Sequence, residues 1–188
     1  VIKVEYANLN YKDFLMSQGH SGLIKKFPHT PGIDASGTIY YSNSKKFLKN
    51  NRVFVIARPL GVDSNGSFSK YITVPDHWVE KLPKSLTSKE IMMIGTSGFT
   101  AVKALNKSLK TILKYKNKPV LVTGATGNVG MFIIFLLPDI GIKIEAITSK
   151  TKNNKILKEM GVTKIYTLKN FLKTPNFALL NEKYSAVF

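Results

Sequence analysis

A glycine-containing turn is the first place in this sequence where residue types and spacing suggest chemistry. Residues 123–130 read Thr-Gly-Ala-Thr-Gly-Asn-Val-Gly and follow the Val-rich run 119–123. They fit the pattern of a dinucleotide-binding turn if Ala125 takes the first glycine position. Gly127 would let the backbone approach a pyrophosphate, and Gly130 would let a helix pack closely on a strand. The alternative is a structural turn without a ligand. We favour the nucleotide site because free N–H groups at a helix start attract phosphate, and its expected contacts are Ala125, Thr126, Gly127, Asn128, Val129 and Gly130.

The end of the next apolar segment indicates which nucleotide would bind. A site specific for NAD places a carboxylate there, on the ribose 2′-hydroxyl. This segment ends instead in Thr148, Ser149 and Lys150, and its acid, Glu145, is interpreted as a neutralised or edge residue. Hydroxyl and ammonium donors suit a 2′-phosphate. The sequence therefore predicts NADPH rather than NADH, bound by these three residues and by Lys164, for which a solvated lysine is the alternative reading.

Two different patterns divide the chain. Up to Pro83, short apolar stretches are broken by Gly, Pro, Asn and Ser, which predicts a β-rich domain with many turns. Beyond it, residues 85–94 and 100–113 have helical spacing, and Thr87 with Glu90 forms a capping box. We therefore place the domain boundary here, with residues 1–88 in the first domain and 89–188 in the second.

The second domain alternates strands and helices, which predicts an α/β fold with a doubly wound parallel sheet. Pro138 should kink or shorten the first helix of this part, and Gly141 should end it. The expected strands are 119–123, 142–148, 164–167 and 185–188, and the expected helices are 131–137 and 154–160.

Composition limits the class of protein. The 188 residues, 44% hydrophobic, can bury a core but fall short of two average domains. No apolar run reaches the roughly 18 residues of a membrane span, and no signal peptide precedes the first strand, so we expect no membrane partner and a cytoplasmic location. Cysteine is absent, which excludes disulfides and thiolate zinc ligands. The first residue, Val1, and the strand-like end at 185–188 suggest a chain cut at both ends.

The formal charge of +17 raises the question of a polyanionic partner. Only Arg52 and Arg58 are arginine among the 28 basic residues, and the lysines are dispersed. We therefore expect no nucleic acid as the partner, although a basic RNA-binding protein stays an alternative.

Several blocks resemble a known family, the medium-chain dehydrogenase/reductase superfamily, and within it the zinc-free branch of acryloyl-CoA reductases and YhdH-type quinone oxidoreductase-like proteins. They cover nearly the whole chain in family order. The blocks are residues 9–13 (Leu-Asn-Tyr-Lys-Asp), 31–37 (Pro-Gly-Ile-Asp-Ala-Ser-Gly), 76–79 (Asp-His-Trp-Val) with 82–83, 94–101 (Ile-Gly-Thr-Ser-Gly-Phe-Thr-Ala) and the glycine turn.

The resemblance implies a GroES-like β-rich catalytic domain followed by a partial Rossmann domain, with the remainder of the Rossmann domain outside this chain. Gly32-Ile33-Asp34 stands where zinc-containing relatives have Gly-His-Glu, and no Cys lies near Asp13, so no metal site is expected. Two departures are Asn50-Asn51 in place of Gly-Asp before Arg-Val, and Asn128 in place of a turn glycine. Asn tolerates left-handed backbone conformations, so both can be accommodated.

The resemblance also implies roles. Asn10 and Tyr11 would be catalytic, orienting a carbonyl or the nicotinamide, while Tyr11 and Thr100 are candidates for cofactor binding. The implied reaction is reduction of the C=C bond of a small α,β-unsaturated acyl-CoA, with hydride from NADPH added to the β-carbon. A quinone or an enone is the alternative substrate, and a homodimer is expected at full length.

Two alternative functions lie outside the resemblance to the medium-chain superfamily. One is a non-catalytic nucleotide- or RNA-binding protein, suggested by the charge and by Asn128. The other is a short-chain reductase, whose Thr-Gly-x-x-Gly-x-x-Gly pattern also matches residues 123–130. That pattern belongs near a chain start, whereas a β domain precedes it here.

Overall fold

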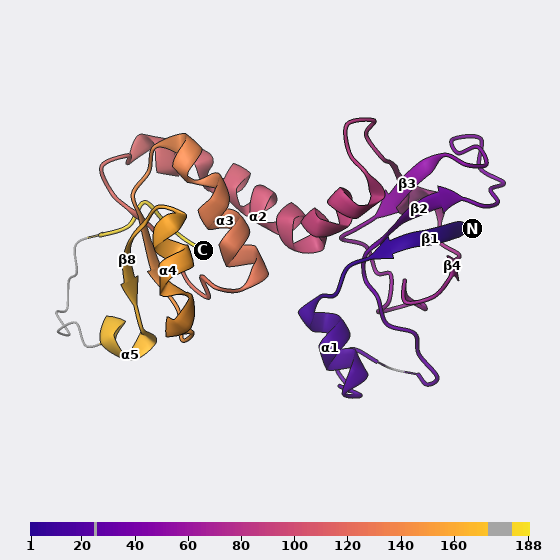
Figure 1. Ribbon diagram of the computed structural model, residues 1–188, viewed down its shortest axis with the longest axis horizontal. Helices are drawn as coiled ribbons and strands as arrows, with labels where there is room; N and C mark the ends of the chain where they lie inside the picture. Colours follow the sequence, from indigo (N-terminus) through magenta and orange to yellow (C-terminus); the bar gives the residue numbers. More distant parts are fainter. Residues whose placement is uncertain (25, 173–181) are drawn as a thin grey trace. The chain divides into compact units, whose positions relative to one another are not determined.

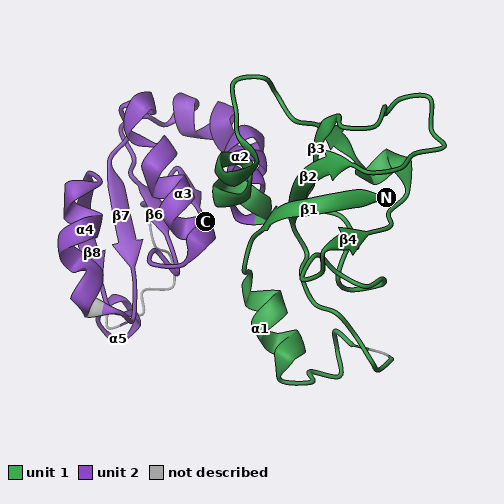
Figure 2. Ribbon diagram, turned by 45° about the vertical axis from the view of Figure 1, so that its right-hand side comes forward, with its two compact units in different colours: residues 1–96 green, residues 97–188 purple. Residues whose placement is uncertain are grey.

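A computed structural model describes residues 1–24, 26–172 and 182–188 of the chain. It forms two compact units, residues 1–96 and 97–188, coloured green and purple in Figure 2. Helix α2 (Ser88–Lys114) crosses from one unit into the other. The boundary expected between residues 88 and 89 falls at the start of this helix, and the assignment of functional domains stays a prediction.

An antiparallel sheet forms the framework of the first unit (Figure 1). The order of its strands is β4-β1-β2-β3-β5, and apolar side chains such as Ile2, Ile39, Val53 and Leu60 are buried against it. The β-rich character predicted from the sequence is confirmed. The strands are β1 (Ile2–Ala7), β2 (Ala35–Ile39), β3 (Arg52–Val55), β4 (Tyr71–Ile72) and β5 (Glu80–Lys81), and the 3-10 helix η1 (Asp76–Trp78) precedes β5.

A short helix, α1 (Tyr11–Ser17), is the element of this unit that the sequence pattern did not indicate. Its carboxylate Asp13 accepts a hydrogen bond from the backbone N–H of Asn10 at 2.8 Å, which satisfies one of the donors at the helix start. Met16 anchors the helix in a small core with Ile24 and Ile33. Two turns of helix are too short for a 3.6-residue period to be recognised.

Helix α2 begins with the expected capping box. The Thr87 N–H donates to the Glu90 carboxylate at 2.7 Å, and the Glu90 N–H donates to the Thr87 hydroxyl at 3.2 Å. Gly95 then interrupts the helix with φ 51° and ψ −162°. A side chain there would also lie 2.4 Å from the Asn8 amide nitrogen, so the position requires glycine. This interruption is why the sequence shows two helical segments.

The second unit contains a parallel sheet with strand order β8-β7-β6-β9, which confirms the expected doubly wound arrangement. Buried residues of helices α3 and α4, Ile133, Ile134 and Leu157, pack with strand residues Val120 and Ile144 in one core. The strands are β6 (Val120–Val122), β7 (Ile144–Ile147), β8 (Val162–Tyr166) and β9 (Ala186–Val187). The helices are α3 (Asn128–Leu136), α4 (Asn154–Glu159) and α5 (Leu168–Phe171), with 3-10 turns η2 (Pro138–Ile140) and η3 (Thr151–Asn153).

The predicted shortening of the helix at Pro138 is confirmed, whereas Gly141 ends the 3-10 turn η2 and not α3 itself. Helix α3 ends before Pro138, a 3-10 turn follows, and Gly141 adopts the left-handed conformation with φ 72°. Within the described residues, no helix combines the length and the apolar character that crossing a membrane would need.

Candidate functional site

The glycine turn joins β6 to α3, as the sequence predicted. Its backbone is fixed by a hydrogen bond from the Gly127 N–H to the Gly124 carbonyl at 2.8 Å and by one from the Ala125 N–H to the Ile147 carbonyl at 3.1 Å. A side chain at Gly130 would lie 2.7 Å from the Gly124 carbonyl oxygen. The first turn of α3 can therefore approach the loop this closely only because residue 130 is glycine.

The six predicted turn residues lie together around the start of α3. Gly127 is the N-cap and Asn128 the first helical residue, so the N–H groups of the following residues have no partner within the helix. Ala125 is fully buried, whereas Gly127 and Asn128 are exposed. The backbone of the turn, rather than its side chains, can therefore receive an anion.

A second turn follows β7 and is tied to the first. The Thr126 and Thr148 hydroxyl oxygens are 3.0 Å apart, and the Lys150 N–H donates to the Thr148 hydroxyl at 3.0 Å. Thr148 is buried, while Ser149 and Lys150 are exposed. Thr148 thus links the two turns, and Ser149 and Lys150 are the residues that this arrangement presents to a ligand.

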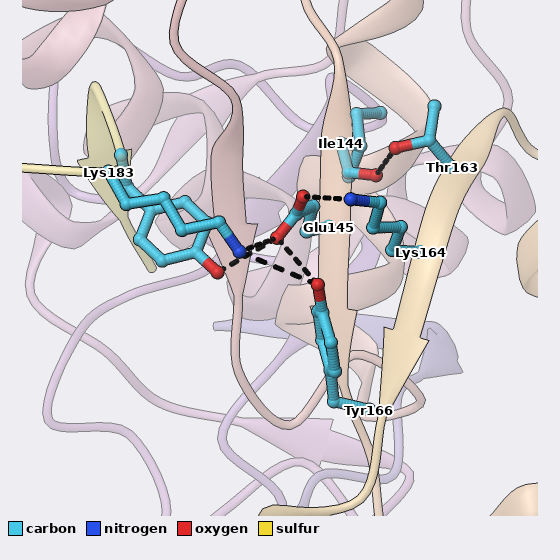
Figure 3. A network of polar contacts seen from close by, with 7 residues as sticks. Ile144, Glu145, Thr163, Lys164, Tyr166 and Lys183 are labelled. Atoms are coloured by element: carbon cyan, nitrogen blue, oxygen red, sulfur yellow. Dashed lines mark hydrogen bonds and ion pairs between the residues drawn. The ribbon is translucent and has the colours of Figure 1, made fainter. Parts of the chain in front are cut away.

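Glu145 lies on β7 and is neutralised, which confirms the interpretation from the sequence (Figure 3). Its carboxylate accepts hydrogen bonds from Lys183 at 2.8 Å, the Tyr184 hydroxyl at 2.8 Å and the Tyr166 hydroxyl at 3.1 Å. Burial by itself raises the pKa of Glu145, but these donors and the charge of Lys183 outweigh it and hold the pKa below its ordinary value.

Lys164 is not brought to the second turn. It is the third residue of β8 rather than its first, and it pairs in register with Glu145, whereas Tyr166 is the β8 residue whose carbonyl accepts the Thr148 N–H. The Lys164 ammonium lies 3.8 Å from the Glu145 carboxylate. Its predicted contact with a cofactor stays a prediction without support from this geometry.

Asn10 and Asp34 are held together in the first unit. The Asn10 amide nitrogen donates to the Asp34 carboxylate at 3.0 Å, and both residues are buried. The same carboxylate accepts the Thr96 N–H at 2.9 Å and the Thr96 hydroxyl at 2.5 Å. The Asn10 amide therefore has a fixed orientation, set by a residue that stands in the motif at 31–37.

Tyr11 lies beside Asn10 but is 72% exposed, with its ring stacked on Phe14 at 6.0 Å between centroids. Tyr11 is therefore not packed inside the domain. Thr100, the other residue proposed from the resemblance, is exposed on α2 in the second unit.

Asp13 holds the loop before α1. It accepts the Asn10 N–H at 2.8 Å and the Gly32 N–H at 2.9 Å while being 1% exposed. Burial raises its pKa, with the nearby Asp34 adding to this and the backbone N–H groups opposing it.

A cavity of about 350 Å³ opens in the first unit beside this network. Two of its lining side chains, Lys12 and Arg58, are basic, and Asp63 is acidic. Arg58 could not be singled out from the sequence, because it lies in a loop outside every motif. The remaining lining residues are Ile33, Ala57, Pro59, Val62 and Thr96.

Comparisons with known proteins agree with this arrangement. Residues 1–84 match the family model of the alcohol dehydrogenase GroES-like domain. The chain is 36% identical to a putative quinone oxidoreductase, YhfP, of Bacillus subtilis, over 88% of this chain and 50% of that protein. It is 34% identical to the acrylyl-CoA reductase AcuI of Ruegeria pomeroyi, over 87% of this chain and 50% of that protein. It thus spans about half the length of these curated relatives.

Solved structures extend the likeness to both units. The YhdH oxidoreductase from Salmonella enterica, solved in complex with NADP, superposes with a TM-score of 0.90 at 29% identity, covering 99% of this chain and 57% of that one. YhfP of Bacillus subtilis, solved with NAD bound, superposes with a TM-score of 0.88 at 33% identity, covering 99% and 56%. The relatives therefore include structures with either dinucleotide.

Proposed function

Because the chain belongs to the medium-chain dehydrogenase/reductase superfamily, we propose that the protein containing it is an NADPH-dependent reductase that needs no zinc. Its substrate is a small α,β-unsaturated acyl-CoA, and the reaction reduces the C=C bond. The observation that carries the proposal is the pair of linked turns after β6 and β7, which presents backbone N–H groups beside exposed Ser149 and Lys150 with no free carboxylate.

The residues of the second unit would hold the cofactor. The turn at 125–130 receives the diphosphate through its backbone, and Ser149 and Lys150 donate to the 2′-phosphate. Thr148 keeps both turns in place through its bonds to Thr126 and Lys150. NADPH, when bound, supplies a hydride to the β-carbon of the substrate.

The residues of the first unit would act on the substrate. Asn10 can donate an amide hydrogen to the thioester carbonyl, where negative charge develops as the enolate forms. Asp34 fixes the direction of that amide, so little reorganisation is needed during the reaction. Tyr11 is exposed next to it and is a candidate for contact with either the carbonyl or the cofactor.

The cavity beside Asn10 favours an acyl-CoA over a quinone. Lys12 and Arg58 line it together with one acid, Asp63, and Arg58 also lies 3.6 Å from the Glu80 carboxylate, so Lys12 is the main source of positive charge in the cavity. Phosphates of coenzyme A would be attracted there, and a neutral quinone would not. A quinone or enone oxidoreductase is the second candidate, because YhfP is described as a putative quinone oxidoreductase.

Turnover measurements on the longest natural polypeptide that contains this chain test the proposal. Acryloyl-CoA and a benzoquinone are each mixed with enzyme and NADPH, and the absorbance of the reduced nicotinamide is followed. We expect faster loss of absorbance with acryloyl-CoA. Faster turnover of the quinone would support the second candidate, and no oxidation of NADPH by any enoyl-CoA or quinone would contradict both.

A further inference from the structure

Glu145 poses an electrostatic problem for the proposed cofactor. It lies on β7, three residues before Thr148, and a strand rises about 3.3 Å per residue, so the two backbones are about 10 Å apart. A carboxylate at that distance, separated from the second turn mostly by protein, would repel a doubly charged 2′-phosphate. NADH lacks this phosphate and would not be affected in the same way.

The side chains around Glu145 remove this charge (Figure 3). One carboxylate oxygen accepts Lys183, Tyr184 and Tyr166, and the other faces Lys164. Only 6% of the Glu145 side chain is exposed, so water contributes little to this neutralisation. The network brings two positive charges to one negative charge.

Lys183 is the principal counter-ion of the two lysines. Its ammonium lies 2.8 Å from the carboxylate, compared with 3.8 Å for Lys164, whose side chain is 64% exposed. The Lys183 ammonium also lies 5.4 Å from the centroid of the Tyr166 ring and 4.8 Å from that of Tyr184. These ring contacts favour the position of the Lys183 ammonium against Glu145, although the Lys183 side chain is 51% exposed.

Lys183 lies far from the cofactor motifs in the sequence. It comes from the segment just before β9, thirty-eight positions after Glu145, and the register of β7 and β8 alone would not reveal it. Its effect on the second turn would be exerted through the charge of Glu145, without contact to the cofactor.

We propose that Lys183, by neutralising Glu145, is a determinant of the preference for NADPH over NADH. The inference rests on the proposed function, since it requires a dinucleotide at the turns after β6 and β7. Lys183 is a positioning residue that influences the choice between NADPH and NADH without belonging to the phosphate-binding motif.

Equilibrium binding of the two dinucleotides to the longest natural polypeptide tests the proposal. The fluorescence of the reduced nicotinamide is titrated with wild-type protein and with Lys183→Met. Lys183→Met removes the nearer of two positive charges and leaves Glu145 with Lys164 alone at 3.8 Å, so the lost positive charge should raise the Kd for the doubly charged 2′-phosphate of NADPH by roughly three- to tenfold. The Kd for NADH should change less than about twofold, because NADH carries the diphosphate but lacks the 2′-phosphate at the end of β7.

Two further variants separate electrostatics from damage to the fold. Glu145→Gln leaves Lys183 without its partner and should shift the ratio of the two Kd values the other way, towards NADPH. The double variant Glu145→Gln with Lys183→Met removes both charges and should restore the wild-type ratio. Glu145→Gln gives a result even where Lys183→Met does not fold.

The outcomes are distinguishable. If wild-type protein binds no NADPH, the proposed function fails. If it binds NADPH but the variants weaken NADPH and NADH equally, or leave the ratio unchanged, Lys183 has only a structural role and the inference is overturned. An opposite response to Lys183→Met and Glu145→Gln, cancelled in the double variant, supports it.

Discussion

In the proposed function, single side chains at the end of β7 set the preference between NADPH and NADH. Lys150 is exposed, and its N–H is fixed by Thr148, so its ammonium is available to a 2′-phosphate. Lys150→Ala should raise the Kd for NADPH about tenfold, which is the loss of one charge-assisted hydrogen bond, and leave the Kd for NADH nearly unchanged. Lys152→Ala, in the same loop, is the matched control. An equal loss for both dinucleotides would show that Lys150 supports the turn instead.

The proposed substrate site depends on Asp34, because this residue orients the Asn10 amide. Asp34 is fully buried and accepts hydrogen bonds from Asn10 and from both the N–H and the hydroxyl of Thr96. Asp34→Ala leaves buried donors without partners and should lower the free energy of unfolding by about 2–4 kcal/mol. Chemical denaturation measures this, with the exposed Asp63→Ala as control. A loss no larger than that of the control would mean that water replaces the carboxylate.

A site residue can be predicted from the sequence when its role depends on its neighbours in the chain rather than on tertiary contacts. Thr126, Gly127 and Gly130 could be named because they follow one another after β6, and Ser149 and Lys150 because they directly follow β7. Thr148 could be named but not its role, because its bond to Thr126 spans twenty-two positions. The orientation of Asn10 was beyond prediction, since Asp34 reaches its amide only through the tertiary fold.

Helices and strands could be predicted from the sequence where their hydrophobic pattern repeats over enough residues to be recognised. The strand-helix alternation of the second unit and the capping box of α2 were predicted from spacing and confirmed. Helix α1 was missed because it spans two turns, and strand β5 has only two residues. Such a strand exists through pairing with neighbours, which no local pattern encodes.

The approach of α3 to its preceding turn can be tested with two glycines. In Gly130→Ala the new side chain meets the Gly124 carbonyl at 2.7 Å, so the helix must shift and stability should fall by about 1–3 kcal/mol, with loss of NADPH binding. In Gly127→Ala the nearest atom is 3.2 Å away, so binding should fall with a smaller loss of stability. Thermal unfolding and fluorescence titration measure both. A variant Gly130→Ala that unfolds and binds like wild type would refute this packing.

The stability that Glu145 of β7 contributes through its ion pair with Lys183 should depend on pH. The pKa of Glu145 is held below its ordinary value of 4.5, so its contribution to stability is complete above pH 4.5 and is lost as the pH falls through the folded-state pKa. Glu145→Gln lacks this contribution. The thermal midpoint of wild type should exceed that of the variant most at neutral pH, and the gap should narrow towards about pH 3. Glu159→Gln, at an exposed position, is the control, and a gap independent of pH would contradict the ion pair.

On the scale of the whole molecule, the residues proposed to act on the substrate and most of those proposed to bind the cofactor lie in different units. Asn10 and Tyr11 lie in the unit 1–96, and the other predicted site residues lie in the unit 97–188. The sequence patterns predicted two domains of different class because each has its own period and its own turn residues. A homodimer at full length stays a prediction, which sedimentation of the longest natural polypeptide would test.

The charge of the chain distinguishes the reductase from an RNA-binding protein. The formal charge is +17, but its lysines are dispersed over both units, and Glu145 and Glu182 already engage three of them. Dispersed cations give only non-specific affinity, with a Kd of roughly 10⁻⁴–10⁻⁶ M at physiological salt. We therefore expect single-stranded RNA to bind weakly, to be released as salt rises, and not to displace NADPH in a fluorescence competition. Displacement of NADPH by RNA at physiological salt would instead place a polyanion at the turns after β6 and β7, because only a shared site makes the two ligands exclude each other.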